Sequence, residues 1–339
     1  MYGKINVAVD YIKLVGGLIL LILSGDYLVR GGVAIATRLK VSPLVIGMTV
    51  IAFGTSAPEF LVSLQAAIKG NSEIAIGNVV GSNIANIALI LGMTALVYPL
   101  KVAKNSLRFD WPVMMIATLL FTWAAAGSII TRIEGIIGAI ALIGYTIWQI
   151  WYSRKNHIHE EEEVVVKPIP IWLSLLFIAG SCVGLAYGAD FLIEGASSIA
   201  QSYGISERVI GVTIVAFGTS LPELAASLSA AFKKQTDIAI GNIIGSNLFN
   251  ILSVIGLTAA IRPIPVDWTN FRPDFIWMCG ISLLLIFLLL PVREAFSLYG
   301  EPLRIKLKAL FMGGRLGRWG GILFVLIYIF YIYTLLIHG

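Results

Sequence analysis

The chain carries two copies of one segment, separated by a constant shift of 164 residues. The shift places VIGMTVIAFGTSAPEF (45–60) on VIGVTIVAFGTSLPEL (209–224) and IAIGNVVGSNIANI (74–87) on IAIGNIIGSNLFNI (238–251), without a gap. Between 44–92 and 208–256 there are 27 identities in 49 positions. Because the two copies are so similar, we expect each to build the same local structure, and the fold must accommodate that unit twice.

The apolar content indicates that this unit lies in a lipid bilayer. Residues of the set AVILMFWYC make up 58% of the 339 residues and charged residues 13%, against about 45–50% and about 25% in soluble domains. A membrane-spanning helix needs about 20 mostly apolar residues. Ten runs approach or exceed this length: 11–36, 43–68, 74–98, 111–131, 135–152, 170–200, 208–232, 238–261, 274–291 and 319–337. We therefore predict an all-α integral membrane protein, and the composition excludes a soluble enzyme, a disordered chain and a disulfide scaffold.

The number of spans in each half predicts how the halves are arranged. Residues 1–152 contain five of the ten spans and residues 170–339 the other five, joined by a short linker at 153–169. An odd number makes the second copy enter the membrane upside down relative to the first, as in many secondary transporters. Apart from Arg30, sixteen Lys and Arg fall on one side of the predicted membrane and seven on the other. Both termini are therefore expected outside the cell and the linker in the cytoplasm.

Two polar segments are expected to stay in water. The linker holds His157, His159 and the run 160–163 of four Glu, so a metal site there is an alternative to a solvated connection. Residues 293–318 are basic with interspersed apolar residues, which predicts an interfacial helix on the anionic inner leaflet or an ordinary loop. Cys182 and Cys279 lie in apolar runs and are interpreted as small core residues.

Each copy contains one span that glycine and proline interrupt and that carries a carboxylate. The motif is Gly54, Thr55, Ser56, Pro58 and Glu59, and it recurs as Gly218, Thr219, Ser220, Pro222 and Glu223. Proline removes the donor to a carbonyl one turn earlier, and a kink there is expected to loosen the carbonyls of Ala52 and Ala216. A charged carboxylate in the middle of an apolar span costs at least about 2.5–3.5 kcal/mol, so Glu59 and Glu223 are interpreted as functional.

A bound cation would neutralise both glutamates, whereas the single guanidinium of Arg30 cannot pair two symmetric carboxylates. Thr55 and Ser56 lie four and three residues before Glu59, on adjacent faces of one helix. The remaining polar groups of the two copies are Ser82, Asn86, Thr219, Ser220, Ser246 and Asn250. All of them offer oxygen ligands, which favour Ca²⁺ and Na⁺ over zinc or copper. A pair of buried, protonated glutamic acids is the alternative.

Other polar and small residues of these spans are interpreted as structural. Gly77, Gly81, Gly241 and Gly245 are interpreted as residues of close helix packing or helix bending, and hydrogen bonds across helices are expected from Asn78, Asn83, Asn242 and Asn247. Three acids lie in the first span of a half: Asp26, Asp190 and Glu194. We expect them to be interfacial or ion-paired, Asp26 with Arg30 four residues on.

The doubled motif resembles the two alpha repeats of the sodium/calcium exchangers, within the cation/calcium antiporter superfamily. GTSAPEF with GSNIAN and GTSLPEL with GSNLFN carry the resemblance, which covers all ten spans. It implies exchange of one Ca²⁺ for several Na⁺ by alternating access, with the first span of each half sliding against a fixed core. By motif position it places the ion-coordinating residues at Ala52, Thr55, Ser56, Glu59, Ser82, Asn86, Ala216, Thr219, Ser220, Glu223, Ser246 and Asn250. The two alanines would act through their backbone carbonyls.

Departures from the family pattern bear on the coupling ion. Some relatives, potassium-dependent members among them, carry Asp where this chain has Asn250, which argues against potassium coupling. Proton/calcium members usually lack GTS before the glutamate, although H⁺/Ca²⁺ exchange and antiport of another cation stay open as alternatives. A cation channel, which would conduct without countertransport, is a further alternative. The linker is too short for the calcium-sensing domains of animal exchangers.

The sequence therefore predicts a secondary active antiporter of the cell membrane and not an enzyme. Phosphate-loop and HExxH motifs are absent from it. Two ionised glutamates balance one Ca²⁺ or two Na⁺, so a third Na⁺ would make the exchange electrogenic. The expected partners are Ca²⁺, Na⁺ and the lipid bilayer, and the sequence indicates no cofactor, nucleic acid or protein partner.

Overall fold

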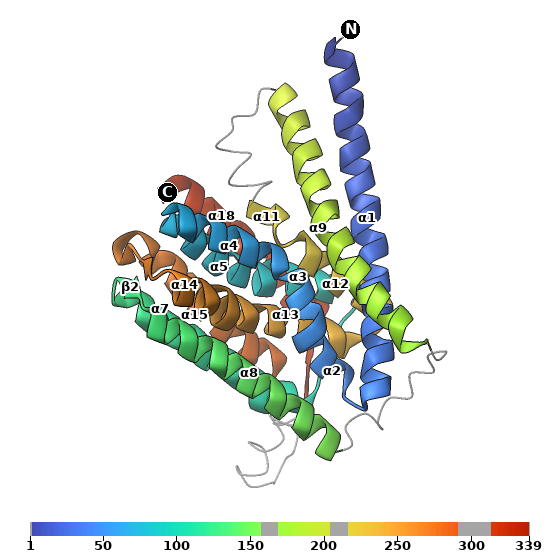
Figure 1. Cartoon of the computed structure of the whole chain (residues 1–339), viewed down its shortest axis with the longest axis vertical. Helices are drawn as coiled ribbons and strands as arrows, with labels where there is room; N and C mark the ends of the chain where they lie inside the picture. The colour runs from blue at the N-terminus through green and yellow to red at the C-terminus, as the bar shows by residue number, and fades with distance from the viewer. Residues whose placement is uncertain (1, 157–168, 204–215, 291–312, 339) are drawn as a thin grey trace.

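The computed structural model describes residues 2–156, 169–203, 216–290 and 313–338, and nearly all of them are helical (Figure 1). In the first half the helices are α1 (Tyr2–Leu39), α2 (Pro43–Ile46), η1 (Gly47–Ile51), α3 (Ala52–Thr55), α4 (Ala57–Lys69), α5 (Ser72–Ala85), η2 (Asn86–Leu91), α6 (Gly92–Val97), η3 (Ser106–Asp110), α7 (Trp111–Ala126) and α8 (Arg132–Lys155), where η denotes a π-helical turn. In the second half they are α9 (Ile171–Ser202), α11 (Ala216–Gly218), α12 (Leu221–Phe232), α13 (Thr236–Leu248), η5 (Phe249–Ile255), α14 (Gly256–Ile261), α15 (Trp268–Leu289) and α18 (Arg318–His338).

Nine of the ten predicted spans lie on helical segments that can cross a membrane. Within the described residues, eight continuous helical segments are long and apolar enough, and the bent pair Pro43–Thr55 and Ala57–Lys69 raises the number to nine. The tenth predicted span, 208–232, begins outside the described residues, and its later part forms α11 and α12. The histidines and glutamates of the linker, and most of the predicted interfacial segment 293–318, also lie outside them.

Two predicted spans have wrong boundaries because local turns and caps start or end the helices elsewhere. The span predicted at 111–131 starts earlier, at the π-helical turn η3, and ends at Ala126, where Gly127 and Ser128 (φ +64°) turn the chain. The span predicted at 274–291 starts earlier, at Trp268, because the Asp267 carboxylate accepts hydrogen bonds from the first backbone N–H groups of α15.

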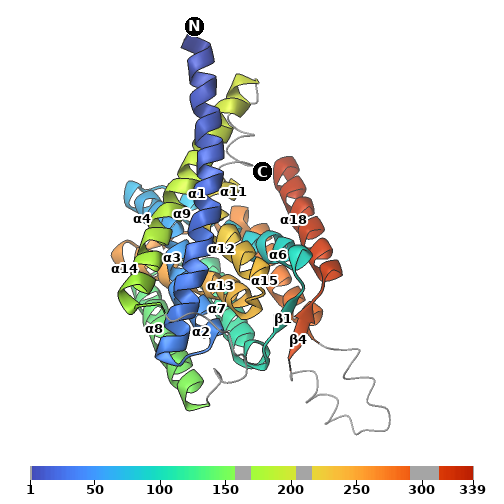
Figure 2. The same ribbon diagram turned by 90° about the vertical axis from the view of Figure 1, so that its right-hand side faces the viewer.

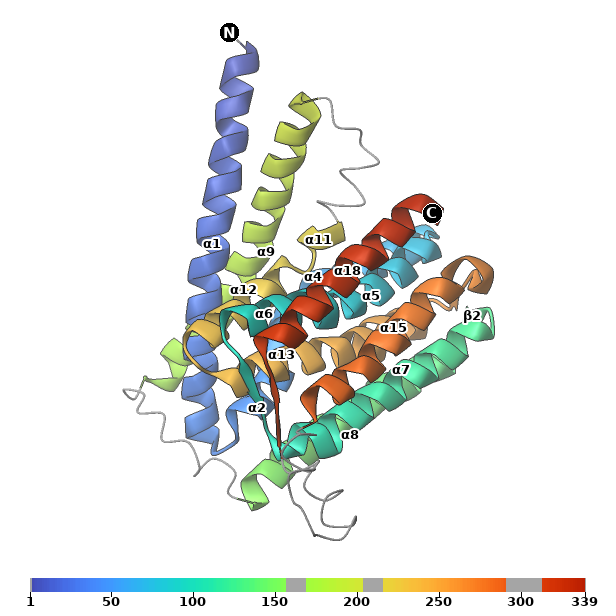
Figure 3. The ribbon, with the colours of Figure 1, turned by 180° about the vertical axis from the view of Figure 1, so that it is seen from behind.

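Helices α1 and α9 stand side by side, and the N-terminal part of α1 and the C-terminal part of α9 extend beyond the block formed by the other helices (Figures 1 and 3). Further along, α1 packs against α12, where a Cβ on Gly25 would lie 2.7 Å from the Ala225 carbonyl oxygen. The contacts between α1 and α9 pair the beginning of one with the end of the other: a Cβ on Gly195 would lie 2.6 Å from the Asp10 carbonyl oxygen, and one on Gly31 3.0 Å from that of Ser174. The two helices are therefore antiparallel, and glycine lets their backbones touch. Their outer faces expose apolar side chains such as Ile12 (70% exposed), as expected in lipid.

The repeated helical segments that follow the two glutamate motifs lie at the centre of the block. In the segments Ser72–Val97 and Thr236–Ile261, 72% and 83% of the most apolar stretch is buried, against 17% in α8 and α18. Gly241 and Gly245 confirm the packing prediction, because a Cβ on Gly245 would lie 2.6 Å from the Met48 Cα. At Gly81 close packing is not found: among the described residues no atom beyond its chain neighbours and its own helix backbone lies within 4 Å of such a Cβ.

Two short antiparallel sheets join the halves at the ends of the helices. Strand β1 (Leu100–Val102) pairs with β4 (Gly314–Leu316), with Leu100 opposite Leu316, and β2 (Ile129–Ile130) pairs with β3 (Ile264–Pro265). The first sheet is visible beside α18 in Figure 2. Each sheet takes one strand from each half, so the peripheral helices of the two halves are tied to one another.

Candidate functional site

The motif of the first copy breaks its helix between Thr55 and Ala57. Ser56 leaves the helical conformation (φ −88°, ψ 5°), and the two parts of the span are bent by 47°. Pro58 lies in the first turn of α4, where its missing N–H would have no partner in any case, and Glu59 follows it in that turn, where the helix dipole favours a negative charge. The expected loosening of the Ala52 carbonyl is wrong, because Ser56 N–H donates to it at 2.9 Å.

The second copy has the same break. Helix α11 ends at Gly218, α12 begins at Leu221, and Ser220 between them has φ −90° and ψ 4°. Its N–H donates to the Phe217 carbonyl at 3.2 Å, and Glu223 lies in the first turn of α12. Ala216 is the first residue of α11. The two motifs therefore place equivalent carboxylates at the starts of two half-helices.

Both glutamates are fully buried, and the helix that follows each of them holds its backbone in the same way. Asn78 donates to the backbone oxygen of Glu59 at 3.2 Å, and Asn242 donates to that of Glu223 at 3.3 Å. Both side chains have 0% exposure. The prediction of interhelical hydrogen bonds is confirmed for these two asparagines.

The remaining amides join the two central helices. Asn86 donates to the Asn247 side-chain oxygen at 3.0 Å, and Asn247 donates to the Asn83 carbonyl at 3.4 Å. Asn247 therefore also confirms the prediction. The Asn83 amide departs from it, because it donates to the Val79 carbonyl of its own helix at 2.7 Å.

On one side of the two glutamates, side chains of the first copy form hydrogen bonds with side chains of the second. Thr55 donates to the Asn242 side-chain oxygen at 3.2 Å, and its hydroxyl lies 3.4 Å from that of Ser246. Ser56 donates to Glu223 Oε1 at 2.9 Å. Four predicted site residues thus meet directly, although they are far apart in sequence.

On the other side, the equivalent residues are separated. Thr219 and Ser220 make no such contact with Asn78, Ser82 or Glu59 among the described residues. Thr219 and Ser82 instead line a cavity of about 550 Å³ bounded by α4, α5, α15 and α18. The site is therefore closed on one side and adjoins a cavity on the other.

Unpaired buried atoms gather at this site. Twelve buried side-chain nitrogen and oxygen atoms of the described residues lack a hydrogen-bond partner, and seven belong to predicted ligands. They are Glu59 Oε1 and Oε2, Asn86 Oδ1, Ser220 Oγ, Glu223 Oε2, and Asn250 Oδ1 and Nδ2. The described residues contain no group of three or more His, Cys, Asp and Glu that could hold a metal, so the oxygen-rich set is unlike a zinc or copper site.

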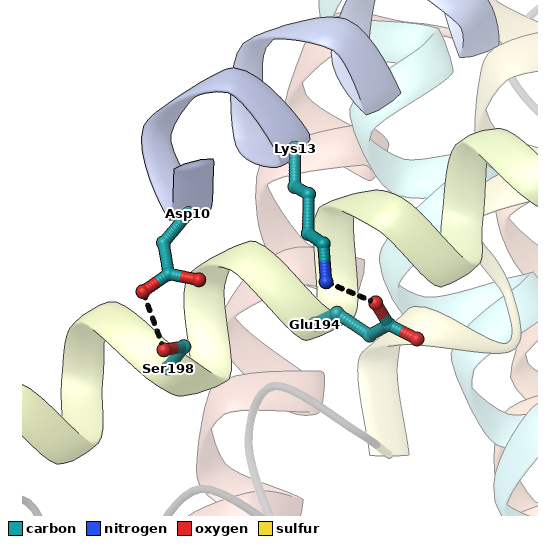
Figure 4. Close-up of polar contacts among 4 residues, drawn as sticks. All are labelled: Asp10, Lys13, Glu194 and Ser198. Carbon is teal, nitrogen blue, oxygen red and sulfur yellow. Dashed lines mark hydrogen bonds and ion pairs between the residues drawn. The ribbon is translucent and has the colours of Figure 1, made fainter. Parts of the chain in front are cut away.

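Polar contacts of α1 and α9 lie outside this site. Lys13 of α1 pairs with Glu194 of α9 at 2.8 Å, and Ser198 donates to Asp10 at 2.6 Å (Figure 4). These contacts link the two helices to each other. The prediction that Glu194 is ion-paired is confirmed, but the sequence could not name its partner, because the two residues are 181 positions apart.

Asp26 joins α1 to the block of core helices. It pairs with Arg30 at 2.7 Å, as predicted, and also with Lys233 at the end of α12 at 2.5 Å. Asp190 is exposed and has no ion-pair partner among the described residues. The repeat could have drawn attention to Lys233, since it occupies the position of Lys69 in the other copy.

Comparison with known proteins places the chain in a family. The family model described as sodium/calcium exchanger protein matches residues 10–151 and 173–337. The chain belongs to the sodium/calcium exchanger family. CaxA of Alkalimonas amylolytica is 38% identical over 275 residues, which cover 80% of this chain and 86% of that protein. The sodium/calcium exchanger MaX1 of Methanosarcina acetivorans is 31% identical over 367 residues, which cover 97% and 99%.

A solved structure shows the same fold. The sodium-calcium exchanger NCX_Mj, from a crystal soaked with Na⁺ and Sr²⁺, superimposes with a TM-score of 0.78 and 32% sequence identity, covering 97% of this chain and 99% of that one. Members of this family are membrane exchangers, so the chain is a multi-pass membrane protein related to cation antiporters.

Proposed function

We propose that this protein exchanges Ca²⁺ for Na⁺ across the cell membrane by alternating access, with the ions held between Glu59 and Glu223. The observation that carries the proposal is the set of unpaired buried oxygens at the two glutamates and their neighbours. A buried carboxylate without a partner is costly, and a cation would supply the missing charge and ligands. Carboxylate, hydroxyl and amide oxygens are the ligands that Ca²⁺ prefers.

The proposed ligands come equally from the two copies: Ala52, Thr55, Ser56, Glu59, Ser82 and Asn86, with Ala216, Thr219, Ser220, Glu223, Ser246 and Asn250. The alanines would contribute backbone carbonyls. The Ala52 carbonyl accepts hydrogen bonds from the Ser56 N–H at 2.9 Å and from the Thr55 hydroxyl at 3.3 Å, so an ion there would replace the Thr55 hydroxyl at the second lone pair. Ca²⁺ and Na⁺ compete for the same oxygens, so the bound Na⁺ ions must leave before Ca²⁺ binds, and Ca²⁺ must leave before Na⁺ binds. Two glutamates balance one Ca²⁺, and a third Na⁺ makes the cycle electrogenic.

The proposed architecture is ten spans in two inverted repeats, residues 1–152 and 170–339, connected by a cytoplasmic linker at 153–169. The antiparallel contact of α1 with α9, which begin the two halves, supports the inversion. In this orientation both termini are external. The Gly70 turn between α4 and α5 is then also external, and the Lys234 turn between α12 and α13 is cytoplasmic.

The test is uptake of radioactive Ca²⁺ into proteoliposomes loaded with Na⁺ and diluted into Na⁺-free buffer. We expect uptake that requires the outward Na⁺ gradient and that increases when a potassium-valinomycin clamp makes the interior positive, because more positive charge leaves with Na⁺ than enters with Ca²⁺. Vesicles without a gradient are the control. Uptake driven by a proton gradient alone would instead assign H⁺/Ca²⁺ exchange, and uptake independent of any countertransported ion would indicate a channel.

A further inference from the structure

The cavity beside the site contains a carboxylate that the ion site does not use. Among the described lining residues, Asp274 of α15 is the one charged side chain. Tyr328 and Tyr331 of α18 and Asn78 of α5 also contribute polar groups to the wall. The cavity of about 550 Å³ can hold several water molecules around a cation.

The Asp274 carboxylate is held but not neutralised. Tyr331 donates to its Oδ1 at 2.9 Å. No Lys or Arg pairs with it among the described residues. A carboxylate on a spanning helix is costly unless water or a cation stabilises its charge, and the cavity gives access to both.

The equivalent acid of the first half shows that the tyrosine contact does not require the cavity. The repeat shift of 164 places Asp274 on Asp110, which accepts a hydrogen bond from Tyr145 at 2.6 Å and one from Gln149 at 2.9 Å. Asp110 is only 3% exposed and adjoins a cavity of about 20 Å³. Each half therefore contains an aspartate bonded to a tyrosine, but only Asp274 lies on a cavity that reaches predicted ligands.

Asp274 lines the same cavity as two of the predicted ion ligands. Ser82 and Thr219 are on its wall, and Ser82 is 5% exposed with no hydrogen bond from its hydroxyl among the described residues. Oxygen groups at both ends of a water-filled space can bind a cation that keeps part of its hydration shell. An acid in a cleft with low-dielectric walls also concentrates cations there.

We propose that Asp274 forms an entry site, at which a hydrated Ca²⁺ or Na⁺ waits in the cavity before it moves to Ser82, Thr219 and the glutamates. This inference rests on the proposed function and adds a residue outside its ligand set. Asp274 raises the local cation concentration on the side of the Gly70 turn. It therefore changes the apparent affinity on that side and leaves the maximal rate to the central site.

The first test compares the Ca²⁺ concentration at half-maximal uptake, measured from the Gly70 side at low ionic strength. We expect Asp274→Asn to raise it about 5-fold with the maximal rate within about 2-fold, and 0.5 M choline chloride to remove most of the difference. Asp274→Glu should behave like the wild type. Glu73→Gln is the matched control, because Glu73 is an exposed acid at the start of α5, beside the lining residue Ile74. An unchanged half-saturation value, or an equal rise in Glu73→Gln, would overturn the proposal.

The second test separates a binding role from a structural one. Tyr331→Phe removes the hydrogen bond but keeps the carboxylate, so we expect a half-saturation concentration equal to or below that of the wild type. A rise as large as that of Asp274→Asn would mean that the aspartate acts only by holding Tyr331, and the entry site would be rejected.

The third test does not depend on transport. In a Glu59→Gln/Glu223→Gln double variant, equilibrium dialysis with radioactive Ca²⁺ should detect weak, salt-sensitive binding that Asp274→Asn abolishes. Residual binding that is insensitive to Asp274→Asn contradicts the entry site. Undiminished transport by the double variant would instead contradict the proposed function, so the two failures are distinguishable.

Discussion

The two copies of the motif have nearly the same sequence but make different contacts. Thr55 and Ser56 reach Asn242, Ser246 and Glu223, whereas the equivalent Thr219 and Ser220 do not reach their counterparts among the described residues. Thr55 is fully buried, but Thr219 lies on a cavity. One sequence unit is therefore compatible with two arrangements, one closed and one open.

The ion pairs of α1 and α9 show the same difference. Asp26 of α1 pairs with Lys233, but their repeat equivalents, Asp190 and Lys69, are exposed and have no ion-pair partner among the described residues. If the halves exchange arrangements during transport, the Asp26 pair must break and the Asp190 pair can form. Because the exchanged state is built from nearly the same contacts, the two states are expected to differ little in free energy.

The largest effect is expected when one of the two glutamates, which both copies share, is replaced. Glu59→Gln and Glu223→Gln should each lower Na⁺-dependent Ca²⁺ uptake by about 100-fold or more, because a neutral amide leaves the divalent ion with half of its balancing charge. The measurement is initial uptake in proteoliposomes at matched protein content, with Glu73→Gln as the control. Wild-type uptake by either glutamate variant would disprove the ligand assignment.

The next prediction concerns the glycines on the closed and open sides. A Cβ on Gly245 would lie 2.6 Å from the Met48 backbone, so Gly245→Ala should lower the stability of this state by about 1–3 kcal/mol in thermal unfolding. A Cβ on Gly81 meets no described atom within 4 Å beyond its chain neighbours and its own helix backbone, so Gly81→Ala should not lower the unfolding temperature.

Gly81→Ala should nevertheless slow Ca²⁺ uptake by about 10-fold, because the exchanged state needs the close contact at Gly81 that this state makes at Gly245. Gly16→Ala, on α1 with no described atom within 4 Å, is the control. Normal uptake by Gly81→Ala would show that the two copies do not exchange packing.

A smaller effect is expected when the ion pair between Lys233 and Asp26 is removed. The side chains of Lys233 and Asp26 are 27% and 31% exposed, and a pair of this kind contributes about 0.2–1 kcal/mol. Lys233→Ala should therefore raise the ratio of the state open on the Lys234 side to the state open on the Gly70 side by about 1.4- to 5-fold. Lys69→Ala should lower the same ratio. Reactivity of a cysteine placed at Ala226 measures this ratio, and equal changes in both variants would contradict the paired roles.

The smallest effect is expected between α1 and α9. The Lys13 and Glu194 side chains are 38% and 57% exposed, so their coupling in a double-mutant cycle should be at the low end of about 0.2–1 kcal/mol. Because this pair joins two helices that are proposed to move together, its loss should change uptake less than 2-fold. A loss of transport as large as that in the Gly81 variant would mean that the pair lies at a moving contact.

The sequence predicted most of the helical fold because lipid imposes a simple rule on span length and composition. The Gly and Pro positions also located the break at Ser56 and at Ser220. The boundaries of α7 and α15 were wrong because a turn at Gly127 and a cap at Asp267 depend on local geometry that an apolar window does not register.

The asymmetry of the site could not be predicted from the sequence. A repeat with 27 identities in 49 positions predicts symmetric contacts. Gly245 is closely packed and Gly81 is not, and this difference depends on the conformational state rather than on the sequence. The pairing of Asp26 with Arg30 followed from the spacing of four residues, but the long-range partners of Asp26 and Glu194 could not be predicted, since Lys233 and Lys13 approach them only through tertiary packing.

Exchange of arrangements between the two halves is tested most directly by the accessibility of one pair of equivalent positions. Val62 lines the cavity, and its repeat equivalent Ala226 is 1% exposed. Val62→Cys and Ala226→Cys would be placed separately in a chain with Cys182 and Cys279 replaced by Ser, and treated with a membrane-impermeant thiol reagent from each side during Na⁺/Ca²⁺ exchange. If the two halves exchange arrangements, Val62→Cys reacts only from the side of the Gly70 turn and Ala226→Cys only from the side of the Lys234 turn. Reaction of both from the same side, or an Ala226→Cys variant that transports but never reacts, would contradict it.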